Sequence, residues 1–331
     1  MGSVKGSKKV MADKMTKNLM KSRILLAVVI VAVYVVFNFI TGGLLLTGAN
    51  LSHLFSGTVS SILMAWAMLF IFLPGIIDLS VGAIFILAAN VGGIFAVNLN
   101  LGTFGLVVGA ILTSIALLML NTILRQALKI PSWIFGIGAM MVYEAIGMFY
   151  SSSMVSQGTQ VVSLGDTARE ISKMPWNIIV VVIGFLLAYL VLHKTSAGYN
   201  LQALGSNQIV AEHMGINVFK TLIYSAIIGG IFLGLAAAIN LSAVNRVMPS
   251  LGLTSMQFII NALAGFLLAS TLQKIVNLPF AIIISLFFIS SIFNVLTILG
   301  VPSGTWQETT MGLVVILSGL VANRKFEGVV K

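Results

Sequence analysis

A short polar block interrupts otherwise apolar sequence at residues 74–82, which read Pro-Gly-Ile-Ile-Asp-Leu-Ser-Val-Gly. Its Asp78 and Ser80 favour helix N-termini, because their side-chain oxygens accept hydrogen bonds from the unpaired amides of the following first turn. A carboxylate within a membrane is costly and usually faces a cavity or a partner, so Asp78 could also lie in a polar pathway. We expect the capping role, which is compatible with the second one.

A second carboxylate, Glu144, lies inside the apolar stretch that follows Pro131. At membrane depth it should pair with a neighbouring helix or face water rather than lipid. We expect a structural hydrogen bond to another helix; the alternative is that Glu144 lines or gates a solute pathway. Several asparagines near or within apolar segments could likewise either bond between helices or line a solute route. We expect hydrogen bonds between helices, each of which stabilises the packing by about 0.6 kcal/mol. The asparagines are Asn90, Asn121, Asn240, Asn261 and Asn294.

Motifs of catalysis are missing from the sequence. It has no glycine-rich nucleotide cradle followed by lysine, no paired carboxylates at helical spacing, no histidine pair around a glutamate and no Gly-x-Ser-x-Gly elbow. There are no cysteines, and His53, His193 and His213 stand singly, without metal-ligand spacing. We therefore predict no catalytic residue, metal or cofactor, and any nucleotide hydrolysis must come from another chain.

Composition places this chain in a lipid bilayer. Of its 331 residues, 59% are hydrophobic and 8% are charged, whereas a soluble domain has about 25% charged residues. At about 20 apolar residues per crossing, the sequence predicts an all-α, polytopic membrane protein with about ten transmembrane helices. The first segment is too long for a signal peptide and has no cleavage site after it, which indicates an uncleaved helix. The ten segments are residues 24–46, 54–73, 76–97, 104–124, 131–150, 177–192, 218–240, 255–271, 278–297 and 306–322.

Basic residues give this arrangement an orientation. With a cytoplasmic N-terminus, fifteen of the 18 lysines and arginines fall on the inner side, and only Arg169, Lys173 and Arg246 fall outside. Both termini are therefore predicted to be cytoplasmic, with a basic tail at residues 1–23, a transmembrane domain at 24–322 and a second tail at 323–331. Since the formal net charge of +10 resides in loops, nucleic acid is not an expected partner.

Two loops are long. Residues 151–176 are predicted to lie outside, and residues 193–217 inside the cell. In the inner loop, a short helix is expected over residues 206–214, preceded by Gly205 and stopped by Gly215. Apolar residues of this helix could pack on the protein itself or fill the groove of a partner. They are Ile209, Val210 and Met214.

Two of these stretches resemble a known family: the permease subunits of bacterial sugar ATP-binding-cassette (ABC) importers of the ribose and galactose type, which also includes permeases for autoinducer-2 and nucleosides. The family's Gly-Ile-Asp-Leu-Ser-Val-Gly block is matched, with one extra isoleucine, by Gly75, Asp78, Leu79, Ser80, Val81 and Gly82. Its Ala-x-Gly-x-Asn-x-x-Ala-Ala-x-x-x-Gly-Ile block is matched, with Val210 for the first paired alanine, by Ala203, Gly205, Asn207, Ala211, Gly215 and Ile216. Gly300-Val301 and Trp306-Gln307 resemble the family's final segment.

The resemblance implies an all-helical importer fold in the bacterial inner membrane. It implies two cytoplasmic ABC ATPase subunits, a second permease subunit of the same or a related chain, and an extracytoplasmic substrate-binding protein that delivers a small sugar-like solute. The residues that fall on the family's ATPase-coupling loop are Gly205, Asn207, Ala211 and Gly215, with Glu212 between them. Transport would be by alternating access driven by ATP, and the solute could be a pentose, a hexose, a nucleoside or autoinducer-2.

One block departs from the family. Where the family has Asp-Ala-Ile-Ala-Ala and a glycine- and serine-rich turn, residues 257–270 begin Gln-Phe-Ile-Ile-Asn, so Gln257 replaces the aspartate. We therefore hypothesise that the chain is one half of a heteromeric permease. The rival functional class is an ion-coupled secondary transporter, which would use Asp78 and Glu144 to bind the coupling ion.

Overall fold

The computed structural model describes residues 2–155, 158–273, 275–302 and 304–323, and all regular secondary structure within these ranges is helical. The predicted all-α class is confirmed. The helices are α1 (Gly2–Ile40), α2 (Gly48–Phe72), α3 (Val81–Val97), α4 (Gly102–Leu128), α5 (Ser132–Val155), α6 (Trp176–Lys194), α7 (Ser196–Ser206), α8 (Gln208–His213), α9 (Val218–Val244), η1 (Thr254–Met256), α10 (Gln257–Leu272), α11 (Leu278–Ile298) and α12 (Thr305–Asn323).

Each of the ten apolar segments overlaps a helix, although the bounds differ at several ends, such as the start of α3 at Val81 rather than residue 76. Helices α7 and α8 lie between two of these segments. Within the described residues, eight helices are long and apolar enough to cross a membrane, and α3 is a shorter apolar helix. The chain is therefore a polytopic membrane protein, as predicted. The number of crossings and the cytoplasmic placement of the termini stay predictions.

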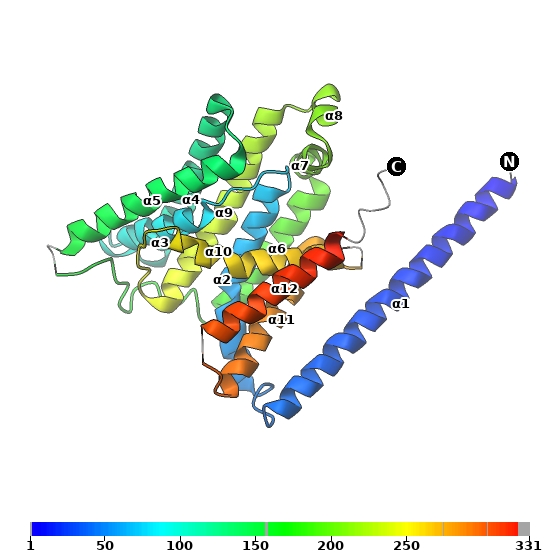
Figure 1. Cartoon of the computed structure of the whole chain (residues 1–331), viewed down its shortest axis with the longest axis horizontal. Coiled ribbons are helices and arrows are strands. Elements are labelled where there is room, and N and C mark those ends of the chain that lie inside the picture. Colours follow the sequence, from blue (N-terminus) through cyan, green and yellow to red (C-terminus); the bar gives the residue numbers. More distant parts are fainter. Residues whose placement is uncertain (1, 156–157, 274, 303, 324–331) are drawn as a thin grey trace.

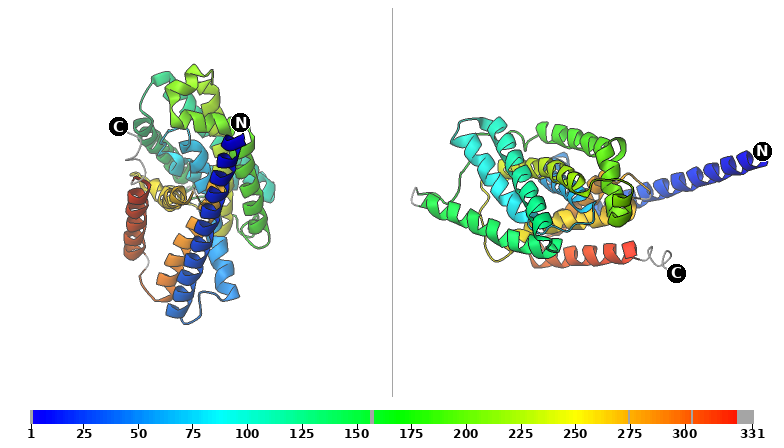
Figure 2. Two further views of the ribbon diagram at one scale, coloured as in Figure 1. Left: turned by 90° about the vertical axis from the view of Figure 1, so that its right-hand side faces the viewer. Right: turned by 90° about the horizontal axis from the view of Figure 1, so that it is seen from above.

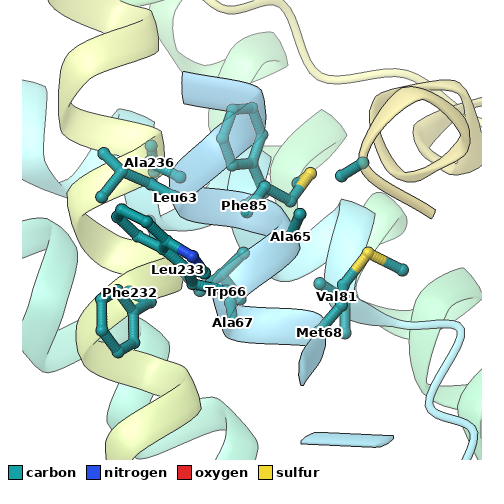
Figure 3. Close-up of a cluster of buried hydrophobic side chains, with 14 of the residues drawn as sticks. Leu63, Ala65, Trp66, Ala67, Met68, Val81, Phe85, Phe232, Leu233 and Ala236 are labelled. Atoms are coloured by element: carbon teal, nitrogen blue, oxygen red, sulfur yellow. The ribbon is translucent and has the colours of Figure 1, made fainter. Parts of the chain in front are cut away.

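The core lies where α2, α3, α4 and α9 meet. The Trp66 ring of α2 is 5.7 Å from the Phe232 ring of α9 (Figure 3). Phe232 also stacks on Phe70 of α2 at 5.6 Å, and all three side chains are fully buried. Helices approach closely at small residues: a methyl group on Gly230 or Gly234 would overlap the α4 backbone. The glycines that the sequence supplies thus allow helix packing.

Helix α1 differs from its prediction. Residues 2–40 form one continuous helix, whereas a basic tail at 1–23 and a helix at 24–46 were expected; residue 1 lies outside the described residues. The helix stands apart from the bundle over much of its length (Figures 1 and 2). It is linked to neighbouring segments by the Tyr34–Ser291 hydroxyl pair at 2.7 Å and by Arg23 Nε, which donates to the Ile275 carbonyl at 2.9 Å.

The two ends of the molecule carry different segments. Helices α7 and α8 lie toward the same end of the molecule as the start of α1, and the turn between α1 and α2 lies at the other end (Figure 1). The loop predicted to lie outside folds over the end of α9, because the Leu164 amide donates to the Asn245 carbonyl at 3.3 Å and Ser242 donates to the Ala168 carbonyl at 2.8 Å. This arrangement is compatible with the predicted sidedness of both loops.

After α9 the chain turns back into the bundle. Asn90 of α3 donates to the Val247 carbonyl at 3.1 Å, and a methyl group on Gly82, near the start of the same helix, would overlap the Ser255 carbonyl. At 1.5 Å per helical residue, the chain therefore runs about 12 Å along α3 before α10 begins. Helix α10 then lies across α2 at mid-height in the molecule (Figure 1).

Candidate functional site

The segment 193–217 forms two capped helices, not one. Thr195 accepts from the Gly198 amide at 3.2 Å at the start of α7, and Asn207 accepts from the Val210 amide at 3.1 Å at the start of α8. The helix expected over residues 206–214 is therefore shorter, since Ser206 ends α7 and α8 covers Gln208–His213. The sequence-based analysis missed α7, in which Gly205 lies, although Thr195 is a good N-cap residue.

Gly215 stops α8 as predicted. It has a φ of +85°, which favours glycine, and its amide donates to the Glu212 carbonyl at 2.9 Å. The next amide, that of Ile216, donates to the Ala211 carbonyl at 3.1 Å. These two bonds satisfy carbonyls at the helix end in the Schellman pattern. The path of the backbone from α8 to α9 is thereby fixed.

Helix α8 presents apolar side chains to its surroundings. Ile209 is 69% exposed and Met214 77% exposed, and Val210 is also exposed, whereas Ala211 is buried. Glu212 and Asn207 are on the exposed side as well. Because α8 lies at one end of the molecule (Figure 1), these exposed apolar side chains are a candidate contact surface for another protein.

Gly205 joins this segment to the polar block at residues 74–82. A methyl group on Gly205 would overlap the Leu73 carbonyl oxygen and lie 3.6 Å from Cα of Pro74. The φ of Gly205 is not positive, so the backbone conformation alone does not require glycine here. The close approach to Leu73 does. The stretch around Gly205 is thus packed against the backbone that leads into the first block of the family resemblance, more than a hundred residues away in the sequence.

Asp78 is the centre of a buried hydrogen-bond network. Its Oδ1 accepts from the Ser80 amide at 2.9 Å and the Ser80 hydroxyl at 2.6 Å, and its Oδ2 accepts from Asn121 of α4 at 3.0 Å. Asn121 also donates to Ser80 Oγ at 2.7 Å and accepts from the Tyr143 hydroxyl of α5 at 2.6 Å. The network therefore ties the turn after α2 to two further helices.

The capping expected of Asp78 and Ser80 takes a different form. Ser80 occupies the N-cap position of α3, but its side chain makes no capping bond, because its hydroxyl is engaged by Asp78 and Asn121. Asp78 caps the Ser80 amide instead of an amide of α3 itself. Arg125 of α4 shares a cavity of about 20 Å³ with Asp78, which places a positive charge near the carboxylate.

Glu144 pins the start of η1 and α10. Its side chain is buried, and its two oxygens accept from the Leu253 amide at 3.0 Å and the Ser255 amide at 2.9 Å. These contacts are of the structural kind expected for Glu144, with the partner being backbone that leads into a helix. Because Tyr143 precedes Glu144 on α5, the Asp78 network and the α10 start are held by adjacent residues.

The candidate residues thus fall into one connected set and one exposed set. Contacts run from Gly205 to the turn at Leu73, from Asp78 through Asn121 to Tyr143, and from Glu144 to α10. Sequence reasoning did not assign Tyr143 or the pairing of Asn121 with Asp78. Neither Tyr143 nor Asn121 lies in a motif, and their partners come from other parts of the fold. Asn207 and Glu212 are outside this network, on exposed α8.

Comparison with known proteins gives a family. The family described as "Branched-chain amino acid transport system / permease component" matches residues 50–321. Similar curated proteins include the ribose import permease protein RbsC of Bacillus subtilis, 27% identical over 296 residues, with 83% of this chain and 85% of that protein covered. The D-allose transport system permease protein AlsC of Escherichia coli is 25% identical, with 87% of each chain covered.

A third relative, the autoinducer 2 import system permease protein LsrC of Photorhabdus luminescens, is 26% identical, with 79% of this chain and 78% of that protein covered. No solved structure matches. The family match covers well over half of the chain and agrees with the apolar helices of a multi-pass inner-membrane protein. The chain therefore belongs to the branched-chain amino acid transport system permease family.

Proposed function

We propose that this chain is the transmembrane subunit of an ATP-driven importer for a sugar or sugar-like solute. The relatives are named as import permeases for ribose, as an allose transport permease and as an autoinducer 2 import permease, which supports small hydroxylated solutes as the class. Since the sequence has no nucleotide-binding motif, ATP hydrolysis is assigned to separate cytoplasmic subunits. An external binding protein would deliver the solute.

The observation that carries this proposal is the contact between Gly205 and the Leu73 carbonyl. It connects a segment with exposed apolar side chains directly to the backbone between α2 and α3. Backbone packed against backbone has little room to slide, because a close-packed interior transmits displacement. A force applied to α8 would therefore reach the bundle without a flexible linker between them.

The proposed mechanism is alternating access. Closure of the ATPases around ATP draws the two coupling segments of the assembly together, and Gly205 moves the turn at Leu73. The Asp78 network passes this displacement to α4 and α5, and Glu144 passes it to the start of α10. Packed helices respond by rocking between discrete arrangements rather than by bending continuously. The solute cavity thereby changes the side on which it opens.

The ATPase assay tests this coupling. Gly205→Leu and Ala211→Arg should abolish the stimulation of ATP hydrolysis by solute-loaded binding protein in the reconstituted complex, while the complex still assembles. Gly138→Leu is the matched control, because Gly138 has no atom within 4 Å of an added methyl group. If both coupling variants retained normal stimulation, segment 193–217 would not be the coupling element.

The composition of the permease pair is a separate proposal. Gln257, which departs from the family block, is exposed on α10, where a second permease could supply a complementary group. We infer a related but different partner chain. Mass spectrometry of the purified complex decides this point, since a single permease species would show a homodimer.

An uncoupler separates the proposal from ion-coupled transport. In that rival mechanism Asp78 and Glu144 would bind the ion, but all four carboxylate oxygens accept hydrogen bonds from protein groups. With ATP held constant, collapse of the proton gradient should leave uptake unchanged. Loss of uptake under these conditions would favour the ion-coupled class.

A further inference from the structure

A polar groove lies between α2, α10 and α11. It has a volume of about 260 Å³ and is lined by polar side chains from all three helices, among them His53 and Ser61 of α2, Asn261 of α10 and Ser290 of α11. Apolar residues such as Leu286 and Phe293 complete its walls. The groove lies apart from the Asp78 network, with which it shares no residue.

The polar groups in this groove are of two kinds. Some are satisfied internally: Thr58 donates to the Leu54 carbonyl at 2.7 Å, and Asn294 exchanges two hydrogen bonds with Asn50 at 2.9 and 3.0 Å. Among the residues that the structure describes, the side chains of the other group make no hydrogen bond. They are His53, Ser61, Asn261 and Ser290.

Unpaired polar groups on this face cannot be turned toward lipid at low cost. An amide without a hydrogen-bond partner in hydrocarbon costs several kcal/mol, and Asn261 is exposed. The face of α6 shows the contrast, because its exposed side chains are apolar, such as Val182, which is 50% exposed, and Leu187. The face with the groove therefore requires water or another polar surface.

The position of the groove indicates what it opens to. His53 lies early in α2 and Thr297 is the second-last residue of α11, so the groove begins near the end of the molecule that is opposite α8 (Figure 1). Toward α8 it extends as far as α10, to which it is joined by Asn261. With the predicted orientation, the open end faces outside.

We propose that this groove is the outward-facing part of the solute route and that it takes a small, neutral, polyhydroxylated solute. The inference rests on the proposed function and names the route within it. Hydroxyl and amide groups of Ser61, Ser290 and Asn261 can both donate to and accept from sugar hydroxyls, and no aspartate, glutamate, lysine or arginine lines the groove. Uncharged lining without a deep enclosed site suits passage better than tight binding.

Helix α10, which forms the inner end of the groove, is also the helix whose start is held by Glu144. Asn261 lies less than two turns after Ser255, whose amide donates to Glu144 at 2.9 Å. A shift of α5 relative to α2 would therefore move Asn261 relative to Ser61. This gives the transport cycle a defined way to change the outward opening.

Single-cysteine labelling tests the route, because the chain has no cysteine of its own. Ser61→Cys, Asn261→Cys and Ser290→Cys are treated, in the assembled complex in spheroplasts, with a negatively charged, membrane-impermeant methanethiosulfonate. A thiol reacts as the thiolate, which forms in water and not in lipid. We expect all three to be modified at least tenfold faster than the lipid-facing control Val182→Cys. We also expect modification to lower the uptake that each variant retains, measured against the same variant left untreated.

Three results would overturn this proposal. Labelling no faster than in Val182→Cys would show that the face is dry. Cross-linking of Asn261→Cys to a second permease, without labelling, would show a packing contact rather than a route. Rapid labelling without loss of uptake would show a water-filled surface off the route. Uptake is measured with D-ribose or D-allose, whichever the untreated complex transports; if neither is transported, the labelling rates alone decide.

Failure of the proposed function gives a different pattern. Labelling reports water in the groove and needs neither ATP nor ATPase subunits. Normal ATPase stimulation in both Gly205→Leu and Ala211→Arg would therefore remove the coupling assignment while the labelling rates stay as predicted. A dry groove together with lost stimulation would remove only the route.

Discussion

Removal of the Asn121 side-chain amide should destabilise the bundle more than removal of any comparable asparagine. Asn121→Ala breaks the bonds to Asp78 at 3.0 Å, to Ser80 at 2.7 Å and from Tyr143 at 2.6 Å. At about 0.6 kcal/mol per bond between membrane helices, the lower bound is about 2 kcal/mol. Leaving the Asp78 oxygen and the Tyr143 hydroxyl unpaired, at up to about 3 kcal/mol each, gives an upper bound of about 6 kcal/mol.

Asn90→Ala is the matched control. Asn90 is the same residue type, is 3% exposed against 1% for Asn121, and also donates two hydrogen bonds from its amide, here to backbone carbonyls of Ile86 and Val247. Its loss should therefore cost about 1 kcal/mol plus a similar cavity term. The free energies of unfolding are measured in mixed micelles by denaturant titration, with tryptophan fluorescence as the signal.

A double-mutant cycle isolates the network. Asn121→Ala and Tyr143→Phe should be non-additive by 0.5 kcal/mol or more, about the minimum for directly bonded pairs, and Asn90→Ala with Tyr143→Phe should be additive. The reasoning is refuted if Asn121→Ala costs no more than Asn90→Ala, or if its effect adds simply to that of Tyr143→Phe. Either result would show that the hydrogen bonds around Asp78 do not act as a unit.

Three other changes test the remaining links. Gly82→Ala should displace the start of α10, because the added methyl group would overlap the Ser255 carbonyl. We expect a lower melting temperature and slower uptake. An unchanged melting temperature and uptake rate would contradict the close packing of Gly82 on Ser255. Glu144→Leu should leave the amides of Leu253 and Ser255 unpaired, at a cost of about 1–3 kcal/mol each. Hydrogen exchange at these two amides should therefore become at least tenfold faster. Unchanged protection would show that Glu144 does not hold them. Met214→Glu should weaken ATPase association at least tenfold in pull-down titrations, because it places a charge on the exposed apolar surface of α8. The matched control is the same change at Met248, which is exposed outside α8, and it should leave the association unchanged. Equal binding by both variants would remove the α8 surface.

The helical pattern could be predicted from the sequence because it depends on local properties. Apolar stretches located helices α1 to α6 and α9 to α12, and Gly215 correctly located the end of α8. The extent of α1 and the existence of α7 were missed, since a polar helix has no apolar stretch to reveal it. The re-entry of the chain before α10 was also missed, because it depends on contacts with α3 that are distant in sequence.

The candidate site shows the same division. Asp78 and Glu144 could be selected from the sequence as costly charges in apolar surroundings. Their partners could not, because Asn121 and Tyr143 are ordinary residues until the helices bring them together. Asn261 and Asn294 were indistinguishable in sequence, yet Asn294 is paired with Asn50 and Asn261 stands unpaired in the groove.

The location of α8 tests the central claim most directly. A Met214→Cys variant of the naturally cysteine-free chain is exposed to an impermeant maleimide, first in intact spheroplasts and then after permeabilisation. We predict that the thiol reacts only after permeabilisation, and that prior assembly with the ATPase subunits slows the reaction at least tenfold. Reaction in intact spheroplasts at the rate of a Met248→Cys control would place α8 outside the cell, where no cytoplasmic ATPase could act on it.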